Sequence, residues 1–337
     1  METPHVQARL RQLLDENAQF ALDARGTTNH CPMALVALAR MGASPERLQD
    51  FFKRWTQTYA LRETHREFPV AGKSWLAQLG VPAAFSSLRK HFLESIGASN
   101  PAEVLREVIS RAPFAPATGA FHALIRIGYG LESGHAGEIA AGLAAYVSNN
   151  LTIDVEWSGR EAARSVEDGL AVLSGRLSGR TWPGSSITSR LKAVAADPDF
   201  EDALRAPPMS PAFLDDIARA AIELYWQTAN FTVLHMVTGT YAARSVLAQL
   251  PEELAGQLGP SIWTAFCAAF VSVGAPKPVS RNTPEISAGW PEILKRATES
   301  QDDHVIKMVY TCFRESRRDP DSPYLASASR ILRARQT

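Results

Sequence analysis

Four of the eight histidines stand in apolar sequence with helical spacing, and they are the residues best suited to bind a metal ion. They are His30, His122, His235 and His304. A buried imidazole must have its ring nitrogens satisfied, and ligation of iron, copper or zinc is one way to do so. For any one of the four, a hydrogen-bonded core histidine is the simpler interpretation. Burying four unrelated imidazoles in separate helices is costly, so we predict that they converge on one ion.

The other four histidines lie among polar or charged neighbours. They are His5, His65, His91 and His135. Polar faces of helices normally meet water. We therefore predict that these four side chains are solvated.

Lys307 adds a possible charged ligand to the four neutral rings. It follows His304 by three residues, so both side chains project from one helical face. The stretch 305–313 is apolar nearly all round, which indicates burial, and burial lowers the pKa of a lysine. A neutral amine can react with carbon dioxide to give a carbamate, which supplies an oxygen ligand. The alternative interpretation is a lysine whose ammonium group reaches back to water.

The elements that must position these residues are helices. Apolar residues recur at three- and four-residue intervals through most of the chain, and strand patterns are scarce, with 151–155 the only candidate. Helices are expected over about 5–23, 32–41, 45–62, 81–97, 100–111, 118–131, 136–149, 160–178, 211–229, 231–249, 260–273, 285–299, 302–317 and 322–334.

The chain is expected to form one large all-α domain, residues 1–337, with the metal site buried between helices. Pro and Gly cluster near 179–186, 206–211 and 274–284. The first of these loops could separate an N-terminal half, 1–178, from a C-terminal half, 187–337. None of them resembles a long flexible linker.

Composition excludes several classes of partner. Lys+Arg and Asp+Glu number 35 each, which gives no support for a nucleic-acid or anionic-membrane surface. The three cysteines are far apart and never in a C-x-x-C pair, so neither a disulfide framework nor a thiolate zinc site is expected. No secretory leader is apparent and no stretch approaches about 18 uncharged apolar residues, so a cytoplasmic location is predicted.

Familiar nucleotide and hydrolase motifs fail on inspection. Gly72-Lys73-Ser74 resembles the end of a phosphate-binding loop, but Glu67 stands where its first glycine is required. Gly128-Tyr129-Gly130 lies inside an expected helix, with no strand before it, so it is no dinucleotide fingerprint. Pro183-Gly184-Ser185-Ser186 lacks the second glycine of a nucleophile elbow.

The segments that contain the four apolar-context histidines resemble the questin oxidase-like family in sequence and in order. The similar segments are Thr28-Asn29-His30 with Pro32–Gly42, Gly119–His122 with 124–129, Phe231–His235, and Asp302–Lys307. The resemblance implies an α-helical fold and oxidative cleavage of polycyclic aromatic ketones, especially anthraquinones of polyketide pathways. Some members are Baeyer–Villiger-type oxidases. Others are non-haem iron dioxygenases with four histidines and a carboxylated lysine, which fall here on His30, His122, His235, His304 and Lys307.

On this basis the expected activity is that of an Fe(II)-dependent mono- or dioxygenase with O2 as co-substrate. Four imidazoles and the Lys307 carbamate would fill five octahedral positions and leave the sixth for dioxygen or substrate. An electron-rich hydroxyaromatic would be oxidised beside a ring carbonyl and its ring opened. The electrons would come from the substrate or from NADPH, although no nicotinamide site is visible.

Three further residues are candidates for contacting this small aromatic substrate. Tyr129 and Trp226 could pack against a flat ring, although lone aromatics are more often core residues. Arg126 lies one helical turn from His122 and could bind a phenolate, or could instead form an outward-facing salt bridge.

Two other functions stay open at the level of sequence. One keeps the fold but uses the histidines as acid–base groups in a metal-free, NADPH-dependent Baeyer–Villiger reaction. The other is a non-catalytic helical protein that binds a flat aromatic ligand. Metal content and oxygen consumption distinguish the three.

Overall fold

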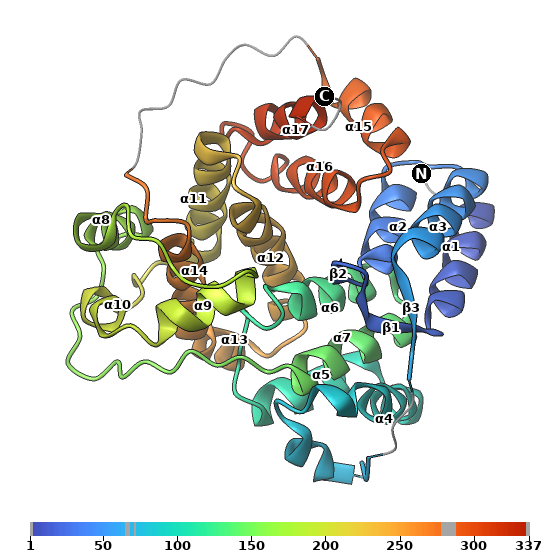
Figure 1. Cartoon of the computed structure of the whole chain (residues 1–337), viewed down its shortest axis with the longest axis horizontal. Helices are drawn as coiled ribbons and strands as arrows, with labels where there is room; N and C mark the ends of the chain where they lie inside the picture. The colour runs from blue at the N-terminus through green and yellow to red at the C-terminus, as the bar shows by residue number, and fades with distance from the viewer. Residues whose placement is uncertain (1–2, 65–67, 71, 278–287, 335–337) are drawn as a thin grey trace.

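Four helices form a closed ring of contacts at the centre of the chain. The computed structural model describes residues 3–64, 68–70, 72–277 and 288–334. In it α6 (His122–Ser133) packs against α2 (Cys31–Arg40) and α12 (Phe231–Leu247), and α16 (Asp303–Glu315) packs against the same two helices. Figure 1 shows these helices, from the blue, green, gold and red parts of the chain, meeting in the middle. One central core thus joins the early, middle and late parts of the chain.

The fold is mainly helical, as the apolar spacing predicts, and the bounds agree to within a few residues for most elements. The remaining helices of the expected set are α1 (Pro4–Asn17), α3 (Pro45–Tyr59), α4 (Phe85–Ala98), α5 (Pro101–Arg111), α7 (Ala136–Ser148), α8 (Val166–Leu177), α11 (Phe213–Thr228), α14 (Gly259–Ser272), α15 (Trp290–Glu299) and α17 (Tyr324–Ala334). The sequence reading missed α9 (Ile187–Ala195), α10 (Pro198–Ala203), α13 (Glu252–Gln257) and two 3-10 turns, Gly72–Gln78 and Pro82–Ala84. The first residues of the helix expected over 285–299 lie outside the described residues.

Capping side chains fix where two of the four central helices begin. The side chain of Asn230 accepts a hydrogen bond from the amide of Thr232, which starts α12. Asp302 accepts from the amides of His304 and Val305, which starts α16. Such caps satisfy amides that have no partner within the helix. His235 and His304 therefore lie in the first two turns of helices whose first residue is set by the sequence.

The strand prediction was wrong in position. Residues 151–155 are irregular, and the only sheet in the described residues pairs β1 (Phe20–Ala24) with β2 (Thr27–Thr28) and β3 (Ala60–Arg62), both antiparallel. The expected helix over 5–23 therefore ends at Asn17, and that over 45–62 ends at Tyr59. Gly26, with φ +72°, supplies the left-handed residue of the tight turn between β1 and β2. The apolar residues of β1 could not by themselves distinguish this short hairpin from a helix.

The central helices approach closely at small residues. A Cβ atom added at Gly128 of α6 would lie 3.0 Å from the Cβ of Ala242 on α12. One added at Gly239 of α12 would meet the ring of Phe121 at the same distance. Gly128, which belongs to the Gly128-Tyr129-Gly130 fragment, thus allows α6 and α12 to pack tightly.

A second set of polar contacts ties the same four helices together, about ten residues along from their beginnings. Glu132 of α6 accepts hydrogen bonds from Tyr310 and Arg314 of α16, the latter at 2.9 Å, and from Tyr241 of α12 at 3.0 Å. Arg40 of α2 donates to the backbone carbonyl of Glu132. We call these five residues the Glu132 cluster.

One described helical stretch, Glu252–Ser272, is long and apolar enough by length and composition to cross a membrane. In the structure 61% of its most apolar window is buried, which is typical of a core helix. From the sequence no apolar stretch of this length was expected, and a helix was expected only over 260–273.

Candidate metal centre

The imidazole rings of the four apolar-context histidines lie together inside the ring of central helices. Nε2 of His122 is 2.8 Å from Nε2 of His30 and 3.1 Å from Nε2 of His235. The ring of His304 lies 4.6 Å from that of His30 and 5.3 Å from that of His235, centroid to centroid. Ligand atoms of His30, His122 and His304 all lie within 4.8 Å of one another. Residues 274 positions apart thus meet at one point.

An oxygen atom faces Nδ1 of every one of these rings. His122 Nδ1 donates to the carbonyl of Gly119 at 2.6 Å, and His235 Nδ1 donates to that of Phe231 at 2.8 Å. Nδ1 of His30 and of His304 both lie near Oδ1 of Asp303, at 3.0 and 2.8 Å. Because a carbonyl or carboxylate oxygen only accepts, each Nδ1 carries the proton and each Nε2 keeps its lone pair.

The Nε2 atom of His122 has the spacing to those of His30 and His235 that metal ligands require. For bonds of about 2.1 Å, two nitrogens at right angles about one ion are about 3.0 Å apart. The observed separations of 2.8 and 3.1 Å match this value. Nε2 of His304 is buried and has no partner among the described residues, and the Thr28 hydroxyl lies 2.9 Å from Nε2 of His30. The donor set therefore fits a divalent cation that prefers imidazole.

Burial keeps the rings neutral, which is the form that binds metal. Together with the charge of Lys307 it lowers the pKa of His30 to about 3, although Asp303 opposes the shift. Burial also places the pKa of His122 and His235 well below the ordinary value, with neighbouring histidines adding to the effect. The pKa of His304 is lowered by burial and by Lys307.

Asp303 is the residue that the sequence analysis missed. Its side chain is buried, Oδ1 faces Nδ1 of two ligand candidates, and Oδ2 accepts from the indole of Trp55 at 3.0 Å. A single carboxylate thus orients rings that come from opposite ends of the chain. The sequence feature that could have pointed to Asp303 is its position beside His304 in a largely apolar helix, where a carboxylate needs a buried partner.

Lys307 lies next to the four rings and does not reach water. Its side chain is 2% exposed, and Nζ is 3.8 Å from Oδ1 of Asp303. Burial lowers its pKa to about 8, although Asp303 and Asp302 raise it. At neutral pH roughly a tenth of the amine is therefore uncharged. This is the state that can form a carbamate.

The backbone before His122 is strained in a way that aims its ring. Gly119, Ala120 and Phe121 have φ values of +58°, +56° and +70° in succession. Two non-glycine residues in the left-handed region cost free energy and persist only where the surroundings hold them. The turn brings the carbonyl of Gly119 against Nδ1 of His122, and the buried ring of Phe121 packs against Gly239.

Phe231 marks the side of the cluster that faces outward. Its ring is 45% exposed and lies 4.8 Å from the ring of His235 and 4.7 Å from that of His304, between centroids. In the sequence this residue stood out only as part of the Phe231–His235 segment. A large exposed aromatic beside two candidate ligands offers a flat apolar surface.

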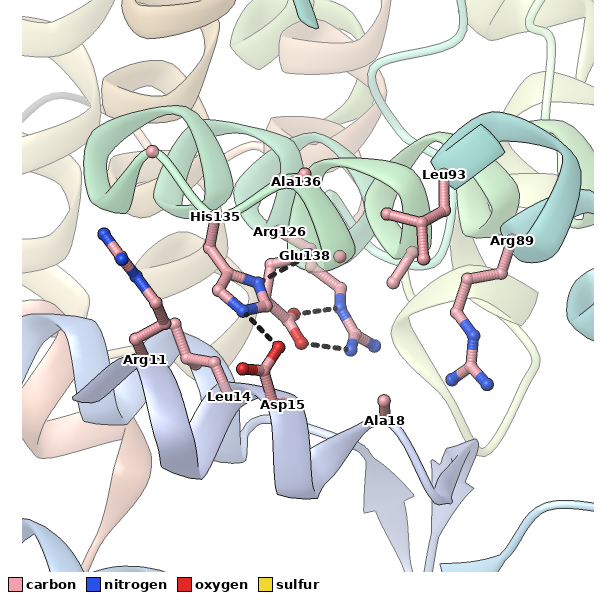
Figure 2. A pocket seen from close by; sticks show the side chains of 13 residues that line it. Arg11, Leu14, Asp15, Ala18, Arg89, Leu93, Arg126, His135, Ala136 and Glu138 are labelled. Atoms are coloured by element: carbon pink, nitrogen blue, oxygen red, sulfur yellow. Dashed lines mark hydrogen bonds and ion pairs between the residues drawn. The ribbon is translucent and has the colours of Figure 1, made fainter. Parts of the chain in front are cut away.

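The three candidate substrate contacts have different positions. Arg126 is buried and paired through two nitrogens with Glu138 at 2.8 and 3.2 Å, so it forms an inward salt bridge rather than an outward one (Figure 2). It shares a small cavity of about 60 Å³ with His122. Tyr129 is buried with its ring 6.1 Å from that of Tyr310, and Trp226 lies under Arg330. The last two therefore pack elsewhere than against the histidine rings.

The polar-context histidines behave differently from one another. His5 is exposed, as expected, and His91 is half-buried. His135 is not simply solvated, because its Nδ1 accepts from the amide of Glu138 at the start of α7 and its Nε2 lies 3.0 Å from Asp15. His65 lies outside the described residues.

Comparison with known proteins identifies a family. The family model described as Questin oxidase-like matches residues 27–229 and 225–312, which include all four histidines and Lys307. No curated protein matches the chain.

Proposed function

The chain belongs to the questin oxidase-like family, and on that premise we propose that it is a metal-dependent oxygenase of polycyclic aromatic substrates. The family description indicates an oxidase of polyketide-type compounds. The finer proposal is that Fe(II), held by His30, His122, His235, His304 and a carbamate on Lys307, supports oxidative cleavage of a quinone-type ring by O2.

The observation that carries this proposal is the arrangement of the four rings. The Nε2 atoms of His30 and His235 face that of His122, and Nε2 of His304 is buried without a partner, while each Nδ1 donates its proton to an oxygen atom. Lone pairs at 2.8 and 3.1 Å repel one another unless a cation or proton lies among them. A metal-free acid–base mechanism gives no reason for four rings to share one tautomer.

A bound ferrous ion supplies the electronic state that lets triplet dioxygen react with an electron-rich aromatic. The chain's own residues keep the rings neutral, fix their orientation and exclude water. Asp303 holds two rings and carries negative charge next to the site, which favours a cation over a neutral occupant. Electrons for the reaction come from the substrate or from NADPH.

The substrate is proposed to approach over Phe231. A flat aromatic can stack on the exposed ring, which already touches two candidate ligands. Replacement Phe231→Ala is expected to raise KM for an aromatic substrate roughly tenfold, about 1.4 kcal/mol, with metal content unchanged. Phe68→Ala, at a half-buried phenylalanine outside the cluster, serves as the control. An unchanged KM would place the substrate elsewhere.

Metal analysis combined with oxygen uptake tests the function itself. The whole chain is reconstituted anaerobically with Fe(II), and bound iron and O2 consumption with an anthrahydroquinone are measured. The wild-type protein and the control His5→Ala are expected to bind one iron per chain. His304→Ala and Lys307→Ala are expected to lose iron or activity, and ¹³C-bicarbonate should label the wild type but not Lys307→Ala.

Two outcomes would contradict the proposal. Full iron occupancy with unchanged activity in both the His304 and Lys307 variants would remove these residues from the site. Oxygen-dependent turnover that survives exhaustive chelation would favour the metal-free Baeyer–Villiger mechanism instead.

A further inference from the structure

A pocket of about 300 Å³ opens between the end of α1, α4 and the beginning of α7. Figure 2 shows its interior, with Asp15 and His135 on one side and Arg126, Glu138 and Arg89 on the other. None of the four clustered histidines lines it, and neither does Lys307. It is therefore a feature separate from the proposed metal centre.

The cation at the back of this pocket has unused donor capacity. Arg126 is 4% exposed and pairs with Glu138 through Nε and Nη2 only. Its Nη1 is buried and has no hydrogen-bond partner among the described residues. In Figure 2 the remaining guanidinium nitrogen points away from Glu138, toward the side of the pocket where Arg89 lies. A buried, charged donor without an acceptor is costly, so an acceptor is expected there.

The carboxylates of the pocket are already engaged and do not compete for this donor. Asp15 faces Nε2 of His135 at 3.0 Å, and both oxygens of Glu138 face Arg126. Arg89 pairs at 2.7 Å with Glu63, which lies outside the lining, and it experiences the positive charge of Arg126. An anion between the two guanidinium groups would relieve that repulsion.

The beginning of α7 adds amide donors to the same pocket. His135 caps the helix by accepting from the amide of Glu138, the third residue. The amides of Ala136 and Gly137 precede it, and the first amides of a helix have no intrahelical partner. The N-terminus of a thirteen-residue helix also favours negative charge. The His135 ring packs closely on Gly137, where a Cβ would lie 3.0 Å from it, so only glycine fits at the second residue of α7 with the ring in this position.

We propose that this pocket binds the oxyanion head of a small organic acid or phosphate, held by Arg126, Arg89 and the first amides of α7. The neighbouring groove of about 660 Å³ shares Ala18, Arg89 and Leu93 with the pocket. It gives room for the body of such a molecule. The site needs no metal, although Arg126 also lines the small cavity that contains His122.

Calorimetric titration of chelator-treated whole protein with acetate or inorganic phosphate, at constant ionic strength, tests this inference. Because the chelator removes metal, phosphate cannot bind to a metal ion at the four clustered histidines. Saturable binding of one anion per chain is expected in at least one arm, and the arm that binds more tightly identifies the head group as carboxylate or phosphate.

Variants assign the binding to the pocket. Arg89→Met removes one guanidinium group, and Ala18→Glu places a competing carboxylate at the exposed edge; each is expected to weaken affinity at least tenfold. Arg164→Met removes an arginine that is 85% exposed and lies outside the pocket, and should bind as the wild type does. No saturable binding by the wild type, or wild-type affinity in both pocket variants, would overturn the proposal.

Discussion

The oxygen atoms that face Nδ1 decide which nitrogen of each histidine is available. Two of them are backbone carbonyls and depend on local turns, whereas Oδ1 of Asp303 serves His30 and His304 together. The rings of His30 and His304 therefore both depend on the carboxylate of Asp303. The site is therefore most sensitive to residue 303, outside the ligands themselves.

Replacement Asp303→Asn is expected to weaken metal binding roughly 10- to 100-fold, the usual cost of losing an outer carboxylate. The amide retains one acceptor, so its NH2 group must face either the two Nδ1–H groups or the indole N–H of Trp55, and the negative charge is lost. Competition between the protein and a chelator for the metal measures the change. Asp50→Asn, at a 60% exposed aspartate, is the control. Equal affinities for wild type and Asp303→Asn would remove Asp303 from the site.

The buried rings also predict how the metal-free protein responds to acid. The pKa of His30 is lowered from 6.5 to about 3, so between these values the unfolded chain binds a proton that the folded chain does not. Unfolding free energy is therefore fully retained above pH 6.5 and falls as pH decreases toward 3, by up to about 1.4 kcal/mol per pH unit for this ring.

Urea unfolding at pH 7, 6 and 5 in the presence of chelator measures this slope. His30→Asn should flatten it, whereas His5→Asn, at an exposed histidine, should leave it unchanged. If His30→Asn and the wild type lost stability equally with acid, the ring would not be held neutral by the fold.

At the scale of elements, the site depends on four helices keeping their relative positions. They are held at one level by the histidines and at another by the Glu132 cluster. Close packing of α6 against α12 at Gly128 fixes their separation. Displacing any one of these helices would carry its histidine away from the others.

Replacement Glu132→Ala is expected to lower the free energy of unfolding by about 2–4 kcal/mol, because two tyrosine hydroxyls and an arginine lose their acceptor. Glu132→Gln, which retains an acceptor, should lose less. Thermal and urea unfolding compare the two, with Glu107→Ala on the surface of α5 as the control. A loss below about 0.5 kcal/mol for Glu132→Ala would mean that packing alone holds the helices.

Much of the helical layout could be predicted, because its apolar periodicity is strong. Short elements were missed or misplaced for physical reasons. The β1–β2 hairpin depends on the turn at Gly26, and α10 has only six residues, too few to show a period. The histidines could be selected from flanking sequence, whereas the role of Asp303 depends on contacts between residues 273 positions apart. Tyr129 lies two turns beyond His122 in α6, and its role as a substrate contact stays a prediction.

At the scale of the whole molecule, a metal at the four rings would link segments from all parts of the chain. Binding to the folded state alone stabilises it by about 2.7 kcal/mol at a metal concentration one hundred times Kd. We expect anaerobic Fe(II) to raise the Tm of the wild type by at least about 3 °C. His235→Ala should lose this shift and His91→Ala should keep it. An identical shift in both variants would locate the metal elsewhere.

The distribution of the rings along the chain has a consequence for biosynthesis. Folding during translation proceeds from the N-terminus. His30, His122 and His235 leave the ribosome well before His304 and Asp303, which stand among the last helices. An ion bound by all four rings, as proposed above, would be captured only after α16 has been synthesised and has folded. Its path would then lead through folded structure, and the partly exposed Phe231 lies where that path would end.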